Sequence, residues 1–556
     1  MLSISCIAAL STILFSLIIP TSAAGYAPTV ASCPATLPTI RPGSSTSPQE
    51  SAYISKRQVP ASQAFQKWLK AISSEFDVPT SPVIGLVTSG GGYRSMLSGA
   101  GVVQALDARD SKTPISGLYQ ALTYHTGLSG GSWLLSALAG NDNPTISSLI
   151  QRYWNPLLPD NPLVPDFDSA KWLEIAFQVA EDILTKYAVY DKNKELTGLD
   201  PTLTDPWGRF LSWALLPNSL SGVPGQSLNF SSVTNFASFK NFAIPYPIIT
   251  ALGVDTYDNQ TMPGTTGTQY EFTPHEFGSW DTGISAFAPT QYLGTLFSSG
   301  TPRNIKSCVT AADNLGHILG TSSSLFNAII TFNLCPPGTD ELVCKIFKEL
   351  QTLLGEAGGS SLYANYQNPF LAYKNSPLVN KNPLLNLVDG GESNQNNPIW
   401  PLIQPARKID VIIVNDNSAD TGGMFKGGYP NGSQIYNTYL RARSVSPALT
   451  KMPVIPSSVR SALPTIFGCD EPNAATIVYL PNNNFTYNSG VSTVKFDFLQ
   501  SEIQGIVGNG NAVANAGGEK DWPLCLACAV TGKSGGKRPA GCAGCREKYC
   551  YLGPKV

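Results

Sequence analysis

An apolar strand, a glycine turn and a helix follow one another twice in a short stretch of this chain. In the first unit an apolar run at 82–88 precedes Ser-Gly-Gly-Gly-Tyr-Arg at 89–94, after which apolar residues recur at helical spacing. In the second unit a strand is expected at 118–124, Gly-Leu-Ser-Gly-Gly stands at 127–131, and a helix is expected at 132–139. Strands that alternate with helices in this way are typical of parallel sheets. The pattern therefore predicts an α/β fold with a mostly parallel central sheet and flanking helices.

The two glycine turns also carry the residue types that serine acyl transfer requires. Gly-x-Ser-x-Gly places Ser129 on a sharp turn between a strand and a helix. The chemistry needs an exposed serine, with backbone N–H donors close to the developing oxyanion. Glycines at 89–94 adopt strained turns and let a substrate approach the backbone. Either turn alone is also common in ordinary loops, but together they predict a serine acyl hydrolase with Ser129 as nucleophile.

The base that activates Ser129 is harder to find. The chain has three histidines, His125, His275 and His317. A conventional hydrolase triad runs Ser, then acid, then His along the chain, and it would have to use His317 with Asp281 or Asp313. Asp389 is the better candidate, because it follows a short apolar strand and a carboxylate within hydrogen-bond reach can accept the proton directly. An aspartate that only caps a turn would show the same local pattern.

The N-terminal segment and the composition indicate a secreted protein. Residues 1–24 combine an apolar run with small residues at the end, which predicts a signal peptide rather than a membrane anchor. No other segment approaches the roughly 18 apolar residues of a membrane span. Charged residues make up only 13%, and the net charge of −2 gives no reason to expect nucleic acid as a partner. Four sequons predict surface glycans at Asn229, Asn259, Asn431 and Asn484.

The cysteine count favours disulfides. Eleven cysteines occur, and removal of Cys6 with the signal peptide leaves an even number. The spacing of Cys525 and Cys528 relative to Cys542 and Cys545 is similar to a zinc ribbon. In a secreted chain such cysteines are expected to form disulfides.

The chain divides into four expected parts. Residues 25–60 are rich in Ser, Thr and Pro and predict an irregular leader, in which Lys56-Arg57 is either a dibasic processing site or an exposed pair. A catalytic domain is expected over 61–524, with a large cap over the sheet at about 141–375. Residues 525–556 form a cysteine-rich tail. Core strands are expected to return after the cap at 385–387, 409–414 and 475–480.

Four motifs in order resemble the fungal lysophospholipase/phospholipase B family, whose catalytic domain is shared with the cytosolic group IV phospholipases A2. They are Ser-Gly-Gly-Gly-Tyr-Arg at 89–94, Gly-Leu-Ser-Gly-Gly-Ser-Trp at 127–133, Pro-His-Glu-Phe-Gly-Ser-Trp at 274–280, and Asp-Gly-Gly-Glu at 389–392 with the proline-rich run at 397–405. The resemblance covers nearly the whole mature chain, including the cysteines of the tail. It departs at Ser393 and Asn417, where similar sequences often carry aspartate.

The resemblance implies a Ser–Asp dyad in which Ser129 is the nucleophile and Asp389 its partner. Gly91 and Gly92 would supply the oxyanion-hole amides. Arg94 would lie near the substrate phosphate. A guanidinium can equally form an ion pair that only stabilises the structure. The implied activity is that of a lysophospholipase, which hydrolyses fatty-acyl esters of phospholipids and lysophospholipids in micelles or at membrane surfaces through an acyl-enzyme.

No cofactor or metal is expected. Fewer than sixty residues separate the predicted signal peptide from the first core strand, too few for a calcium-binding β-sandwich of about 100 residues. Burial of Asp389 under a cap would raise its pKa, which predicts an acidic to neutral pH optimum. Two alternatives remain: a secreted α/β-hydrolase esterase or lipase with a Ser-His-Asp triad, and a non-enzymatic protein that binds phosphate at 89–94.

Overall fold

The fold was analysed in a computed structural model of the chain. The structure describes residues 25–217, 222–336, 339, 341–355, 362–459 and 462–553. The predicted signal peptide at 1–24 lies outside the described residues.

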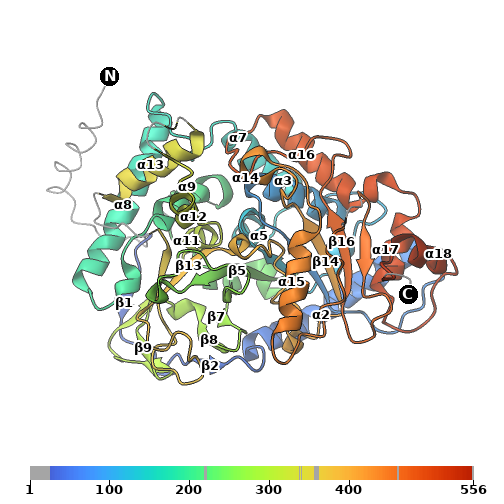
Figure 1. The fold of residues 1–556 in the computed structure, drawn as a ribbon, viewed down its shortest axis with the longest axis horizontal. Coiled ribbons are helices and arrows are strands. Elements are labelled where there is room, and N and C mark those ends of the chain that lie inside the picture. The colour runs from blue at the N-terminus through green and yellow to red at the C-terminus, as the bar shows by residue number, and fades with distance from the viewer. Residues whose placement is uncertain are drawn as a thin grey trace.

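Parallel strands form the centre of the main sheet (Figure 1). In spatial order they are β16 (Thr476–Pro481), β14 (Val411–Asp416), β3 (Ile84–Thr88), β4 (Tyr124–Gly127) and β5 (Tyr246–Val254). Their residues are buried almost throughout, because helices cover both faces of such a sheet. The predicted α/β class is therefore confirmed.

Antiparallel strands extend this centre and make the sheet mixed. They are β15 (Thr465–Phe467), β6 (Gln269–Phe272), β7 (Glu276–Ser279), β8 (Ala286–Pro289), β2 (Arg41–Pro42), β12 (Ala364–Gln367) and β13 (Leu384–Asp389). Outside this sheet, β1 (Thr29–Ala31) pairs with β11 (Cys308–Thr310), and β9 (Phe297–Ser298) pairs with β10 (Thr301–Pro302).

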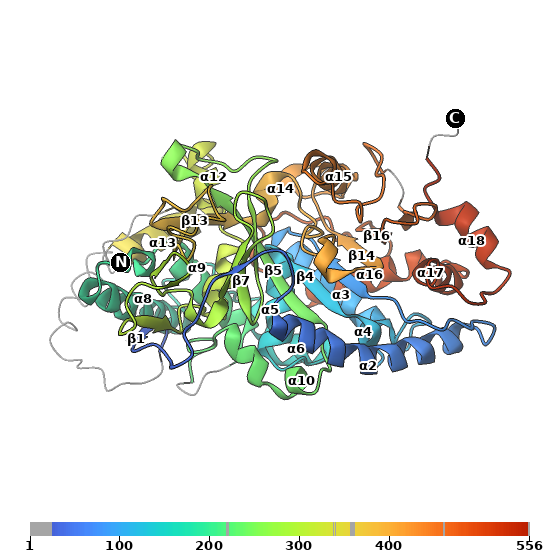
Figure 2. The ribbon, with the colours of Figure 1, turned by 90° about the horizontal axis from the view of Figure 1, so that it is seen from below.

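The predicted cap at 141–375 is wrong as a single layer over the sheet, because this range contributes β5, β6, β7 and β8 to the sheet itself. Four aromatic residues at 270–287 are buried within antiparallel strands, although their mixture with prolines and glycines suggested irregular chain: Tyr270, Phe272, Phe277 and Phe287. The longer helices of the range do gather at one end of the molecule (Figures 1 and 2). They are α8 (Ala170–Lys192), α9 (Thr204–Leu215), α11 (Leu315–Thr321), α12 (Phe326–Thr331) and α13 (Leu342–Gly355).

The other helices flank the sheet and its connections. They are α2 (Pro48–Ile72), α3 (Gly92–Leu106), α4 (Leu118–Ala121), α5 (Gly130–Gly140), α6 (Ile146–Leu149), α7 (Asn155–Leu157), α10 (Ala237–Lys240), α14 (Gly423–Lys426), α15 (Ser433–Ser444), α16 (Gln500–Ala514), α17 (Trp522–Val530) and α18 (Cys542–Tyr549). In the described part of the chain, no helix is long and apolar enough to cross a membrane.

Two local expectations are corrected. The irregular leader predicted over 25–60 ends early, because α2 begins at Pro48 and Ser47 caps it by accepting a hydrogen bond from the Glu50 amide. The Lys56-Arg57 pair therefore lies inside a helix, with Arg57 buried and donating to the carbonyl oxygens of Leu122 and Phe242. The strand predicted at 118–124 is instead the short helix α4 followed by β4, which begins only at Tyr124.

The predicted disulfides are confirmed. Five bridges join Cys33 to Cys308, Cys335 to Cys344, Cys469 to Cys550, Cys525 to Cys545 and Cys528 to Cys542. The two pairs that resembled a zinc ribbon are thus bonded to each other, and the Cys469 bridge ties the tail to the end of β15. Among the described residues, no group of three or more His, Cys, Asp or Glu side chains is placed to hold a metal ion.

The four predicted glycosylation sites differ in exposure. Asn259 and Asn484 are exposed, whereas Asn229 and Asn431 are half-buried. Asn431 also uses its side-chain oxygen to accept a hydrogen bond from the Ser433 amide. Attachment of glycans at these positions stays a prediction.

Candidate active site

Two strands bring the predicted nucleophile and base together on one edge of β5. Strand β4 runs parallel to β5 and ends with Gly127 opposite Ile249. Strand β13 runs antiparallel to β5 and ends with Asp389 opposite Ala251. The carboxyl ends of β4 and β13 therefore meet head to head, separated along β5 only by Thr250, a distance of roughly 7 Å at 3.3–3.4 Å per residue.

The turn after β4 holds Ser129 in a strained conformation. Its φ of 49° and ψ of −126° are rare for a residue with a side chain, and such strain persists only where the surroundings enforce it. A Cβ atom on Gly131 would lie 2.2 Å from the Thr88 carbonyl oxygen, so only glycine lets the turn pack against the end of β3. The predicted sharp turn between a strand and a helix is present, and Ser129 stands just before α5.

The oxyanion-hole candidates lie against this elbow. A Cβ atom on Gly130 would lie 2.0 Å from the Gly92 carbonyl oxygen, which shows how closely the two glycine turns pack. Gly91 is the N-cap residue of α3 and Gly92 its first residue, with φ values of 142° and 59°. Amides at the start of a helix have no intrahelical acceptor, and the helix dipole favours negative charge there. Gly91 and Gly92 thus lie where an oxyanion at Ser129 could be stabilised.

Asp389 is buried beside Ser129. Its carboxylate accepts a hydrogen bond of 2.6 Å from the Gly391 amide, and the residue is 3% exposed. Burial raises the pKa of Asp389 to about 6, although hydrogen bonding by the Ser129 side chain and the Gly391 amide lowers it in part. A base whose pKa lies near neutrality is well matched to accept a hydroxyl proton.

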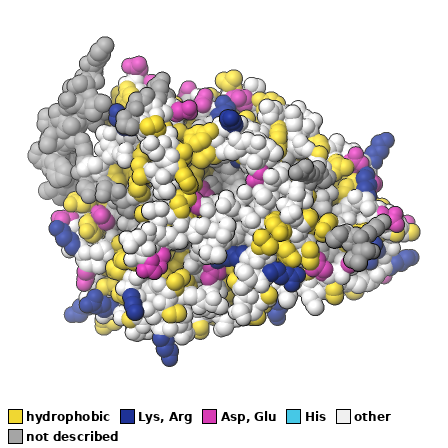
Figure 3. Space-filling view, viewed as in Figure 1, with side chains coloured by type: hydrophobic (Ala, Val, Ile, Leu, Met, Phe, Trp, Pro, Cys, Tyr) yellow, Lys and Arg dark blue, Asp and Glu magenta, His cyan; other side chains and the backbone are white. Residues whose placement is uncertain are grey.

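An apolar cavity opens beside Ser129. Besides Ser129 and Gly92 it is lined mainly by aromatic and aliphatic side chains, among them Trp133, Trp207, Phe326, Ile329, Phe347 and Phe496. Two of these lie on α12 and one on α13. The space-filling view shows a hollow in the same area as α12 and α14, with hydrophobic side chains along one border (Figure 3). Such a cavity suits an acyl chain better than a polar group.

Sequence reasoning missed the segment Ser322–Ser324, which follows α11. The Ser129 amide donates to both the Ser322 hydroxyl (2.9 Å) and its carbonyl oxygen (3.0 Å). The Ser322 hydroxyl in turn donates to the Thr250 carbonyl oxygen on β5. The Asp389 amide donates to the Ser324 carbonyl oxygen at 3.0 Å. One short segment therefore positions both members of the predicted dyad, yet a run of small polar residues carries no catalytic signal in the sequence.

The middle residue of this segment orients the cavity wall. The Ser323 hydroxyl accepts hydrogen bonds of 3.0 Å from the indole N–H groups of both Trp133 and Trp207. It also donates to the Leu319 carbonyl oxygen in α11. The two indoles are thereby fixed with their polar atoms satisfied and their rings on the cavity.

Replacing Ser322 by alanine is expected to lower kcat about tenfold with little change in KM. The variant removes one acceptor of the Ser129 amide and leaves the buried Thr250 carbonyl oxygen without its donor, which loosens the elbow but not the acyl cavity. Steady-state kinetics on a lysophospholipid checks this. Ser136→Ala is the matched control, because Ser136 is a buried serine on α5 whose hydroxyl has no partner among the described residues. A change in KM alone would contradict a positioning role for Ser322.

Arg94 is buried beneath the first glycine turn. Its guanidinium donates to the carbonyl oxygens of Asn417 and Val491 and to the Thr493 hydroxyl. Burial lowers the pKa of Arg94 to about 10, while Asp416 and Asp420 oppose this effect. A Cβ atom on Gly91 would lie 2.5 Å from one guanidinium nitrogen, so the positive charge lies directly under the first glycine turn.

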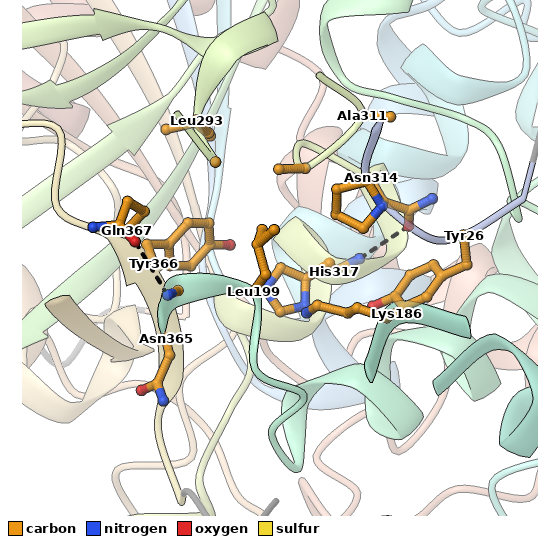
Figure 4. Close-up of a pocket in the computed structure, with 14 residues that line it drawn as sticks. Tyr26, Lys186, Leu199, Leu293, Ala311, Asn314, His317, Asn365, Tyr366 and Gln367 are labelled. Carbon is orange, nitrogen blue, oxygen red and sulfur yellow. Dashed lines mark hydrogen bonds between the residues drawn. The ribbon is translucent and has the colours of Figure 1, made fainter. Parts of the chain in front are cut away.

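The three histidines have other partners. His125 is buried in β4 with its Nε2 3.0 Å from the Thr88 hydroxyl, and His275 Nδ1 lies 2.8 Å from the Tyr246 hydroxyl. His317 lines a separate cavity with Tyr26 and Lys186 (Figure 4). None of the three lines the cavity that contains Ser129.

The two acids that a triad would have paired with His317 are also engaged elsewhere. Asp281 forms an ion pair with Arg441, and the Asp313 carboxylate accepts a hydrogen bond from the Ser231 amide. The acid nearest to His317 is Asp205, 3.5 Å away, which also binds Lys186. Burial, aided by Lys186, lowers the pKa of His317 to about 4, so this imidazole is neutral at ordinary pH.

Comparison with known proteins assigns the chain to a family. Residues 84–555 match the family model described as lysophospholipase catalytic domain. The chain belongs to the lysophospholipase family. It is therefore an enzyme, a hydrolase of carboxylic esters. The chain is similar to lysophospholipase 3 of Aspergillus fumigatus, with 34% identity over 96% of this chain and 89% of the relative. It is also similar to lysophospholipase 2 of Candida albicans, with 35% identity over 95% of this chain and 88% of the relative.

Solved structures support the fold. Human GIVD cytosolic phospholipase A2 superimposes with a TM-score of 0.62 at 17% identity, covering 90% of this chain and 69% of that one. The same human protein in complex with methyl gamma-linolenyl fluorophosphonate gives a TM-score of 0.58 at 19% identity, with 90% and 66% coverage. The expected likeness to the cytosolic phospholipases A2 is thus confirmed at the level of the fold.

Proposed function

We propose that this protein is a secreted lysophospholipase/phospholipase B that hydrolyses fatty-acyl esters of lysophospholipids and phospholipids through a Ser129–Asp389 dyad. The observation that carries the proposal is the meeting of Ser129 and the buried Asp389 at the facing ends of β4 and β13, beside an apolar cavity. Substrates would be presented in micelles or at membrane surfaces.

In the proposed reaction, Ser129 attacks the ester carbonyl while Asp389 accepts the hydroxyl proton. The Gly91 and Gly92 amides stabilise the tetrahedral oxyanion. The proton held by Asp389 passes to the leaving glycerol oxygen, and the fatty acid stays bound to Ser129 as an ester. Asp389 then takes a proton from water, whose oxygen attacks the acyl-enzyme and releases the fatty acid.

The positive charge of Arg94 is proposed to favour binding of the substrate phosphate. Its hydrogen bonds to backbone carbonyl oxygens leave the positive charge unneutralised by a direct ion pair among the described residues, and the guanidinium lies next to Gly91. The side chain would act from beneath the turn and would also hold that turn in place.

Secretion is supported by the five disulfides, which persist in oxidising compartments. Exposed Asn259 and Asn484 agree with glycosylation on that route. The triad alternative has less support, because His317 lies in a different cavity from Ser129. A phosphate-binding protein without activity does not explain an apolar cavity at a strained serine.

The proposal is tested by incubating the purified protein with lysophosphatidylcholine and measuring fatty acid and glycerophosphocholine. We expect equal amounts of both products, with no loss of activity in a metal chelator. A lipid-like fluorophosphonate should inactivate the enzyme and label Ser129, as located by peptide mapping. Label on another residue, or no fatty acid release, would overturn the assignment.

A further inference from the structure

We propose that Glu392 is held as a neutral carboxylic acid that forms a two-hydrogen-bond pair with the side-chain amide of Asn327. This pair connects the turn that follows Asp389 to helix α12, which lines the acyl cavity. Glu392 is then a positioning residue of the active site, and its ionisation breaks this connection. The inference rests on the proposed function for its catalytic consequences.

The contacts of the two side chains point to a proton between them. Asn327 Nδ2 donates to Glu392 Oε2 at 2.8 Å and to the Thr261 carbonyl oxygen at 3.1 Å, which determines the orientation of the amide. In the described part of the chain, Glu392 Oε1 and Asn327 Oδ1 are both buried acceptors without a partner. Two orphaned acceptors on adjacent groups are costly. One proton on Oε1, donated to Oδ1, satisfies both.

The surroundings of Glu392 favour that proton. No basic side chain among the described residues forms an ion pair with it, and the charged group that faces it is another carboxylate, Asp389. The other titratable group that interacts electrostatically with Glu392 is the Tyr363 hydroxyl, which is neutral at ordinary pH. Burial, with a further contribution from Asp389, raises the pKa of Glu392 to about 8. An acid with a buried carboxylate oxygen, beside a like charge and without a cation, takes up a proton.

The pair connects two parts of the site. Asp389 is the N-cap of the 3₁₀ turn Gly390–Ser393, and Glu392 lies three residues further on, a spacing that places side chains on the same side of such a turn. Asn327 lies on α12 between Phe326 and Ile329, which both line the acyl cavity. When Glu392 loses its proton to solvent, the O–H donor disappears and two acceptor oxygens, Glu392 Oε1 and Asn327 Oδ1, face each other. The ionised carboxylate also adds a negative charge near Asp389. We therefore expect activity to fall as pH rises through about 8.

The test compares pH profiles of kcat for the wild type, Glu392→Gln and Glu392→Ala on a lysophospholipid. Glutamine keeps both hydrogen bonds and has no proton to lose, so this variant should retain activity within about threefold at pH 7 and show no alkaline decline. The wild type should lose about tenfold for each pH unit above 8. Glu392→Ala should lose about tenfold or more at all pH values. An alkaline decline unchanged in Glu392→Gln, or wild-type behaviour of Glu392→Ala, would overturn the proposal.

A second measurement does not depend on activity. In an inactive Ser129→Ala background, the Glu392→Gln variant and the protein with Glu392 should have nearly the same Tm at pH 4. Toward pH 8 the Glu392→Gln variant should become the more stable by about 3 °C. The reason is that the native state binds the Glu392 proton more tightly than the unfolded state, so the protein with Glu392 loses stability as pH rises through this window. Asp313→Asn is the control, because burial raises the pKa of this acid outside the site to about 6 only. Its Tm difference should therefore stop growing near pH 6, whereas that of Glu392→Gln should continue to grow toward pH 8. A Tm difference independent of pH would overturn the neutral acid even if the chain proves to have another activity.

Discussion

Replacing Ser129 by alanine is expected to lower the rate of fatty acid release from lysophosphatidylcholine by about 10⁴-fold or more. The hydroxyl is the proposed nucleophile. The other two hydroxyls that line the cavity are already hydrogen-bonded, that of Ser323 to Trp133 and Trp207 and that of Thr493 to Arg94. Binding of the acyl chain should persist, because its cavity is lined by other residues. Single-turnover fatty acid release, together with binding of a fluorescent fatty acid, measures the two effects separately.

Two variants sharpen this result. Ser136→Ala removes a buried hydroxyl from the same helix, α5, and should retain wild-type activity. Ser129→Gly should be as inactive as the alanine variant but more stable by about 1–2 kcal/mol, because glycine tolerates the positive φ that Ser129 adopts. Fatty acid release by Ser129→Ala at more than a few per cent of the wild-type rate would refute the assignment of the nucleophile.

Replacing Asp389 by asparagine is expected to lower kcat by about 10³–10⁴-fold while making the protein more stable at neutral pH. Asparagine can still accept the Gly391 amide hydrogen bond, but it cannot take the Ser129 proton. The wild-type kcat/KM should rise with pH through an apparent pKa near 6, the value to which burial raises the pKa of Asp389. Steady-state kinetics from pH 4 to pH 8 measures both effects.

The stability effect has a definite sign. The pKa of Asp389 is higher in the folded state, about 6, than its ordinary value of 3.8, so the native state binds the proton more tightly. Stability is therefore lost as pH rises from about 4 to 6, and the ionised carboxylate costs about 3 kcal/mol above that window. Asparagine removes this cost. We expect Tm to rise by about 3 °C at pH 7 and to be unchanged at pH 4.

Two controls separate the dyad from its alternative. Asp313→Asn replaces another buried acid whose pKa burial raises to about 6, and it should leave activity unchanged. His317→Gln should also retain activity, whereas a Ser-His-Asp triad would lose it. An active Asp389→Asn enzyme combined with an inactive His317→Gln enzyme would replace the dyad by the triad.

The elements that local sequence predicts well are those whose conformation depends on near neighbours. The strand before each glycine turn and the helix after it follow from apolar periodicity and from glycine at strained positions. Ser129 was therefore identified by its turn alone. Asp389 was recognised from a short strand and two glycines, although an ordinary capping aspartate would look the same.

The elements that local sequence predicts poorly depend on distant partners. The four strands β5–β8 were expected to belong to a cap, because their residues gain strand character only by pairing in the sheet. Residues 118–121 were predicted to be part of a strand at 118–124 but form α4. Arg57 was expected to be exposed and instead binds carbonyl oxygens that lie 65 and 185 residues away.

The sequence by itself determined the chemistry that this protein can perform. The turn that carries Ser129, the glycine turn at 89–94 and the small number of histidines are all properties of residue types and short spacings. Only the tertiary structure decided how that chemistry is assembled. Asp389 reaches Ser129 because β4 and β13 end two residues apart on the same edge of β5. Ser322–Ser324 and the Glu392–Asn327 pair act because segments far apart in the chain are packed together. Such contacts arise from the burial of the whole sheet and leave no local pattern.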